Sequence, residues 1–329
     1  MTQPGDSAHL DTEPVAGGRR RARAVVTVVF GVIVAGFLVF AVTSNWTAIR
    51  DDVSSLSIVD WATSFALGCV GIALTWASWS LVLGGLGGHL GAHDSRALFF
   101  TGQLGKYLPG SVWPALIQSE LGRRHGIARS TMVASYAYAL LLGLASGGLI
   151  GLFSLVQSTS GDATWPSIAA GVGAAIGLLV VVHPRGALTQ ALKIADKLGR
   201  PLAVVHPERR HVIGALALSV ASWIALGAHA FVIALALGAD AGDVTMVVGG
   251  FALAYVAGIV ALPVPGGAGV REGILVVTIG AAAGRSEALT IALISRFILL
   301  AVDLVLALAA GAVPLIASVR SPSVDRDPA

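Results

Sequence analysis

The sequence has little charge, one cysteine and no recognisable constellation of catalytic residues. Only 12% of its 329 residues are charged, and 55% are hydrophobic with a mean hydropathy of +0.82. An ordinary soluble domain carries roughly 25% charge, so water is not the main solvent of this chain. Cys69 has no second cysteine to pair with, which excludes a disulfide framework and a cysteine metal site.

Several function classes are excluded by motifs that are missing. Gly105-Lys106 is followed by Tyr107 rather than Ser or Thr, so the chain has no Walker A phosphate loop. No paired carboxylates, activated nucleophile or metal-ligand cluster stands out. We therefore expect no enzymatic activity, no cofactor and no nucleic-acid partner.

Long charge-free runs predict an all-α polytopic membrane protein, since one bilayer crossing needs about 20 apolar residues. We expect about six full transmembrane helices, at 24–43, 58–84, 130–156, 166–183, 212–238 and 287–318. Two further segments, 97–121 and 245–284, are interrupted by proline and glycine.

The interrupted segments predict two re-entrant helical hairpins. Residues 97–108 form twelve residues of helix, about 18 Å against a hydrocarbon core of about 30 Å. The apolar stretch between Glu272 and Arg285 is equally short. The turns are expected at 108–111 and 263–269, where protein or a wet cavity must satisfy the irregular backbone.

The order of these elements predicts an inverted-topology repeat, with units at about 24–156 and 166–318. An amphipathic connector over about 184–211 joins them within one transmembrane domain, 24–318. Flanking tails occupy 1–23, expected to be disordered and basic, and 319–329. Inverted repeats with broken helices are typical of transporters that bind substrate near the bilayer midplane. The alternative is eight ordinary helices, two of them kinked by proline.

The distribution of basic residues orients the chain. With a cytoplasmic N-terminus, 17 of the 21 Lys and Arg residues fall on the inside, and only Arg50 and Arg285 fall outside. The remaining two, Arg271 and Arg296, lie within membrane segments. We expect a multi-pass protein of the cell membrane with both termini in the cytoplasm.

The two hairpin turns carry the candidate binding residues. Each turn opens a half-helix whose first N–H groups lack partners and whose dipole attracts anions. Arg271 supplies a guanidinium suited to phosphate, Lys106 precedes the first turn and Ser111 is placed to cap the returning half-helix. Close backbone approach is permitted by Gly266, Gly267 and Gly269, although tight packing alone also explains these glycines.

Charged residues on the last helix need a reason, because an unpaired charge in hydrocarbon costs at least roughly 2.5–3.5 kcal/mol. Arg296 is expected to face the cavity with Glu272 as its partner, or to form a structural ion pair that locks hairpin to helix. Asp303 either carries protons or neutralises Arg296.

Other polar and small residues in the long helices are expected to pack. His229 is interpreted as a hydrogen-bonded packing residue rather than a proton relay. Gly143, Gly147 and Gly151 form a small-xxx-small pattern that packs helices.

At Gly105-Lys106-Tyr107-Leu108-Pro109-Gly110 and at 265–272 (PGGAGVRE), the sequence resembles the flippase-like family of the lysylphosphatidylglycerol synthase transmembrane region. This family includes the membrane half of the multiple peptide resistance factors. The resemblance implies a translocase that moves phospholipids or phosphate-linked glycolipids between leaflets. Members with synthase activity carry an added soluble domain. Residues 1–329 do not include such a domain, so the resemblance does not imply aminoacyl transfer.

Membrane lipids with phosphate head groups are therefore the expected partners. The alternatives are a polyprenyl-phosphate sugar as the substrate, or a non-transporting partner or regulator of a lipid or glycan biosynthetic enzyme. The sequence leaves the oligomeric state open.

The topology is tested by accessibility of introduced cysteines. Cysteines at Asp162 and Asp240 should react with an impermeant thiol reagent from outside, and one at Lys197 should not. Cysteines at Asp243 and Glu287, on either side of the second hairpin, should both react from outside. Reaction of only one of them would mean that the segment crosses the membrane.

Overall fold

The computed structural model describes residues 43, 46–107, 113–158, 207–260 and 269–311, and all regular structure in these ranges is helical. In chain order the helices and 3-10 turns are α2 (Trp46–Ser55), α3 (Ile58–Gly85), α4 (Ala92–Gln103), η1 (Leu104–Tyr107), α5 (Trp113–Arg124), α6 (Arg129–Ser158), α9 (Arg209–Ala236), η2 (Ala241–Asp243), α10 (Val244–Val260), α11 (Val270–Ala283) and α12 (Arg285–Ala309).

The prediction of an all-α, multi-pass membrane protein is confirmed. Within the described part of the chain, five helices are long and apolar enough to cross a bilayer: 58–85, 129–154, 209–236, 241–260 and 286–309. The predicted spans 24–43 and 166–183 lie outside the described residues.

Several boundaries differ from those predicted. The short helix α2 follows the first run and was not expected. α4 begins at Ala92 rather than residue 97, and α9 begins at Arg209, inside the predicted connector. With its η2 turn, α10 covers 20 residues, enough to cross a membrane, whereas α11 has 14, about 21 Å at about 1.5 Å per residue.

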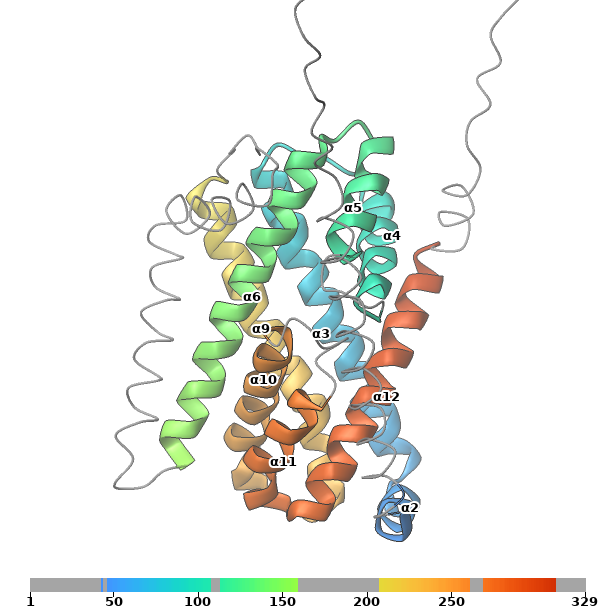
Figure 1. The fold of residues 1–329 in the computed structure, drawn as a ribbon, viewed down its shortest axis with the longest axis vertical. Helices are drawn as coiled ribbons and strands as arrows, with labels where there is room; N and C mark the ends of the chain where they lie inside the picture. Colours follow the sequence, from blue (N-terminus) through green and yellow to red (C-terminus); the bar gives the residue numbers. More distant parts are fainter. Residues whose placement is uncertain (1–42, 44–45, 108–112, 159–206, 261–268, 312–329) are drawn as a thin grey trace, which may run out of the picture.

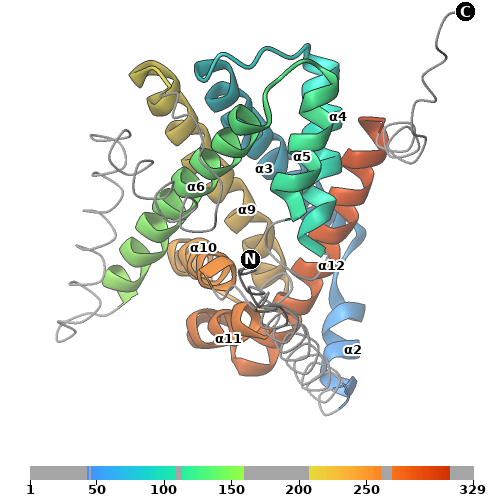
Figure 2. The same cartoon turned by 45° about the horizontal axis from the view of Figure 1, so that its top comes forward.

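The helices divide by height along the molecule (Figure 1). α3, α6, α9 and α12 run through much of the long axis, whereas α4 and α5 lie side by side toward one end and α10 and α11 toward the other. Figure 2 shows α4 between α5 and α12 from a second direction, in agreement with the α4–α5 and α4–α12 contacts. Two helix pairs therefore approach the middle of the molecule from opposite ends.

The centre of the bundle is the antiparallel pair α3 and α9, joined by hydroxyl groups. Ser222 Oγ donates to the Gly71 carbonyl at 2.8 Å and lies 2.7 Å from Thr75 Oγ1. About two helical turns from the Gly71–Ser222 contact, Ser78 Oγ donates to the Ala215 carbonyl at 2.8 Å. Between helices in lipid, small residues and such interhelical hydrogen bonds replace the hydrophobic effect that drives association in water.

Two of the three glycines in the small-xxx-small pattern of α6 make close contacts. A Cβ at Gly147 would lie 2.7 Å from the Trp223 ring, and one at Gly151 would lie 2.8 Å from Leu253 Cβ. A Cβ at Gly143 would meet nothing within 4 Å. The pattern thus packs helices at Gly147 and Gly151, and Gly143 contributes instead through its carbonyl, which accepts from Trp223 Nε1 at 2.9 Å.

Replacing Gly151 by alanine tests this packing. The added methyl group is forced against α10, so Gly151→Ala should lower stability by about 1–3 kcal/mol, the usual cost of overpacking. Gly143→Ala is the matched control and should leave the thermal unfolding midpoint of the purified protein unchanged. Equal midpoints for both variants would contradict the close α6–α10 contact.

Candidate functional site

The α4–α5 pair and the α10–α11 pair are both attached to α12 through charged side chains. η1, which follows α4, reaches Asp303, and the first turn of α11 reaches Arg296. Two successive residues of α11, Arg271 and Glu272, contact two successive residues of α12, Ser295 and Arg296. The charged residues predicted from the sequence thus gather in one centre, where the two pairs meet.

Glu272 both caps α11 and neutralises Arg296. Its Oε2 accepts from the Gly269 N–H at 2.6 Å, and its Oε1 accepts from Arg296 Nη1 at 2.6 Å. Gly269 precedes the helix with φ of 82°, a left-handed conformation that glycine adopts without the steric cost of a Cβ. The expected Glu272–Arg296 pairing is confirmed, with Glu272 only 3% exposed.

Asp303 neutralises Lys106 rather than Arg296. Lys106 Nζ lies 2.6 Å from Asp303 Oδ2, and the Tyr107 hydroxyl donates to the same oxygen at 2.5 Å. Arg296, two helical turns away, is paired with Glu272 instead. The alternative expectation that Asp303 neutralises Arg296 is therefore wrong. The other oxygen, Asp303 Oδ1, is buried and has no hydrogen-bond partner among the described residues.

Arg271 is the buried cation without a carboxylate partner in the described part of the chain. It is 5% exposed, and its terminal nitrogen Nη2 donates to Ser295 Oγ at 3.2 Å. Its guanidinium carbon lies 4.1 Å from the centre of the Tyr255 ring and 5.5 Å from that of Phe251. Nε is buried and has no partner among the described residues, so one donor remains available at the centre.

A hydrogen-bonded chain holds the Arg271 guanidinium from behind. Ser295 Oγ lies 2.9 Å from His229 Nε2, and His229 Nδ1 contacts the Leu226 carbonyl. His229 is fully buried, and its ring packs edge-on against Phe251 at 4.9 Å between centres. The interpretation of His229 as a hydrogen-bonded packing residue agrees with these contacts.

Sequence reasoning missed three residues of this centre: Tyr107, Tyr255 and Ser295. One of them, Tyr255, had a usable signal, because Phe251 and Tyr255 are four apart on a helix and therefore share a face with room for a cation above the rings. Ser295 directly precedes Arg296 and carries no pattern of its own. Of the predicted site residues, Ser111, Gly266 and Gly267 lie outside the described residues.

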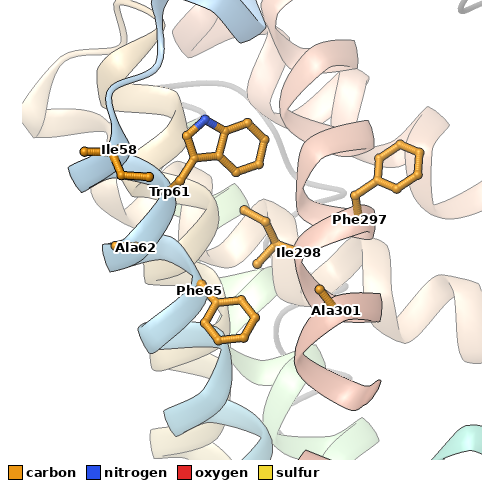
Figure 3. Close-up of a pocket in the computed structure, with 7 residues that line it drawn as sticks. All are labelled: Ile58, Trp61, Ala62, Phe65, Phe297, Ile298 and Ala301. Carbon is orange, nitrogen blue, oxygen red and sulfur yellow. The ribbon is translucent and has the colours of Figure 1, made fainter. Parts of the chain in front are cut away.

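A separate cavity of about 450 Å³ lies between α3 and α12 (Figure 3). Its lining side chains are hydrophobic, and the indole of Trp61 carries the one nitrogen among them: Ile58, Trp61, Ala62, Phe65, Phe297, Ile298 and Ala301. This cavity offers no charged partner to an anion and is distinct from the charged centre. In the described ranges, no group of three or more His, Cys, Asp or Glu residues could hold a metal ion.

Comparison with known families confirms the predicted resemblance. The family described as the lysylphosphatidylglycerol synthase TM region matches residues 26–307. That range includes both helix pairs, η1 and every charged residue of the centre. None of the curated proteins compared with the chain matches it.

The double role of Glu272 predicts a graded response to substitution. Glu272→Ala removes the cap and the partner of Arg296, and should lower stability by about 2–4 kcal/mol. Glu272→Gln keeps an amide oxygen for the Gly269 N–H and should cost about half as much. Thermal unfolding of the purified variants in detergent measures both, and an equal loss in the two would exclude the capping contribution.

Proposed function

The chain belongs to the family of the lysylphosphatidylglycerol synthase transmembrane region, and on that premise we propose that it is a lipid flippase of the cytoplasmic membrane. Its substrates carry a phosphate head group, which enters the charged centre while the tails remain in lipid. The observation that carries this proposal is the buried Arg271 guanidinium, which has no carboxylate partner among the described residues.

Burying a guanidinium without a compensating charge at this depth costs free energy unless an anion binds beside it. An unpaired charge in the hydrocarbon region costs at least roughly 2.5–3.5 kcal/mol, and intramembrane charges usually mark substrate pathways. Lys106 and Arg296 are already neutralised by Asp303 and Glu272. A phosphate would supply the missing negative charge, and Arg presents donors that match its oxygens.

Helix geometry adds to the attraction for an anion. Arg271 is the second residue of α11, where the first backbone N–H groups lack intrahelical partners and the helix dipole is positive. Gly269, the residue before the helix, has a φ of 82° and carries no side chain. The site therefore combines a buried cation with the N-terminal turn of a helix, where Glu272 already accepts from the N–H of Gly269.

Translocation requires access from both leaflets, which an inverted repeat with two re-entrant hairpins would supply. The contacts between helices support such a repeat. Exchanging α3 with α9, α4 with α10, α5 with α11 and α6 with α12 turns the contacts α5–α6, α3–α12 and α4–α12 into α11–α12, α9–α6 and α10–α6, all of which occur. Phosphate could then be reached alternately past the α4–α5 pair and past the α10–α11 pair.

The substrate is either a phospholipid or a polyprenyl-phosphate sugar, and both termini are proposed to lie in the cytoplasm. No enzymatic step is proposed. A non-transporting role as partner or regulator of a lipid or glycan biosynthetic enzyme is the competing function, in which the charged helix pairs would serve docking.

Leaflet exchange in liposomes tests the proposal. The purified protein should move a labelled phosphate-bearing lipid between leaflets faster than protein-free vesicles do. Arg271→Ala should slow this movement by at least about tenfold, because a hydrogen bond to a charged group contributes roughly 1.5–3 kcal/mol. Arg271→Lys should recover part of the rate, since it restores charge without the planar fork.

The controls separate transport from leakage and unfolding. Arg296→Ala should also slow exchange, whereas Arg209→Ala, at an exposed arginine that begins α9, should not. Release of a trapped dye must stay constant throughout. If folded protein moves neither phospholipids nor a polyprenyl-phosphate sugar, the flippase proposal fails and the regulator role is favoured.

A further inference from the structure

The charged centre carries one net positive charge. It contains three cations, Lys106, Arg271 and Arg296, and two carboxylates, Glu272 and Asp303. Each carboxylate neutralises one cation, at 2.6 Å in both pairs. The remaining positive charge belongs to Arg271, whose contacts among the described residues are a serine hydroxyl and two aromatic rings.

The neighbouring titratable side chains add no charge to this sum. The Tyr107 hydroxyl donates a hydrogen bond to Asp303 and keeps its proton, and the Tyr255 ring faces the guanidinium as a neutral π-system. His229 is buried behind Ser295, with one ring nitrogen on a backbone carbonyl and the other on the serine hydroxyl. A second positive charge there would lie beside an uncompensated guanidinium, so the neutral ring is favoured.

Burial makes this charge sum decisive for a ligand. Arg271, Glu272 and Asp303 are 5%, 3% and 1% exposed, so little water screens a mismatch between ligand and site. Two polar atoms, Arg271 Nε and Asp303 Oδ1, are buried without partners among the described residues. Nε offers a hydrogen bond to an anion, whereas the charge on Asp303 repels a ligand with two negative charges more strongly than a ligand with one.

We propose that the site selects phosphodiester lipids, which carry one negative charge at the phosphate, over phosphomonoester lipids. This inference rests on the proposed function and narrows its substrate class. A phosphodiester brings the centre to zero net charge. A monoester carries about −1.5 to −2 near pH 7, since its second pKa is about 6, and would leave close to one negative charge uncompensated.

The proposal sorts membrane lipids by the chemistry of the phosphate. Phosphatidyl esters and polyprenyl-phosphate sugars are diesters and fit the centre. Phosphatidic acid and polyprenyl phosphate are monoesters and do not. Both substrate classes left open above thus fall on the accepted side, provided that the phosphate is esterified twice.

A pair of lipids that differ by one methyl group tests the selection. Phosphatidylmethanol and phosphatidic acid with identical acyl chains are offered in equal amounts to the purified full-length protein at pH 8. Lipid that remains bound after size exclusion is quantified by mass spectrometry. The wild-type protein should retain the methyl ester over the monoester by about tenfold, corresponding to about 1.4 kcal/mol for the uncompensated charge.

Charge-changing variants separate the charge sum from other causes. Asp303→Asn and Glu272→Gln each raise the net charge to about +2 and should bring the ratio to about one or reverse it. The double variant Lys106→Gln with Asp303→Asn restores +1 and should keep the preference, although both lipids bind more weakly. Asp94→Asn, at a half-exposed carboxylate near the start of α4, is the matched control and should leave the ratio unchanged.

Two results would overturn the inference and leave the proposed function standing: equal or better retention of phosphatidic acid by the wild-type protein, or an unchanged ratio in both single variants. Loss of the preference in the double variant would also overturn it, because geometry rather than net charge would then decide. If instead the wild-type protein retains neither lipid above the level of Arg271→Ala, the phosphate site itself fails.

Discussion

The cost of burying charge in a membrane is the constraint on which the arrangement of this protein depends. Lys106, Arg271 and Arg296 lie on three different elements, and each needs compensation close by because the hydrocarbon interior of a bilayer supplies none. Asp303 and Glu272 provide it for two of them, and both ion pairs include a residue of α12. These pairs fix the ends of two separate helix pairs against one helix, so that charge compensation positions the centre.

The same constraint gives the centre its chemical character. Once the two ion pairs have formed, Arg271 is left with Ser295 and the rings of Tyr255 and Phe251. Such a setting holds a guanidinium in place but does not cancel its charge. Under the proposed function, one phosphate would cancel this charge each time a lipid head group enters the site.

How much could be read from the sequence depends on how local the signal is. Long apolar runs gave α3, α6, α9 and α12 to within a few residues at most ends, because hydrophobic length is a local property. The Glu272–Arg296 pair was also predictable, since two charges in apolar surroundings must find partners. The Lys106–Asp303 pair was not, because it joins residues 197 positions apart that share no pattern. α2 was missed because its ten residues form a short segment that is not apolar. Tyr255 was missed because an aromatic residue needs no charged partner to be buried.

The central claim is that a lipid phosphate lies against the Arg271 guanidinium in the bilayer. Solid-state NMR of protein carrying ¹⁵N-labelled arginine in phospholipid bilayers measures this directly, through dipolar transfer between lipid ³¹P and arginine ¹⁵N. The account predicts a transfer signal that is lost in Arg271→Lys and kept in Arg209→Lys, which removes an exposed arginine instead. A spectrum in which Arg271→Lys loses no phosphorus contact would contradict it.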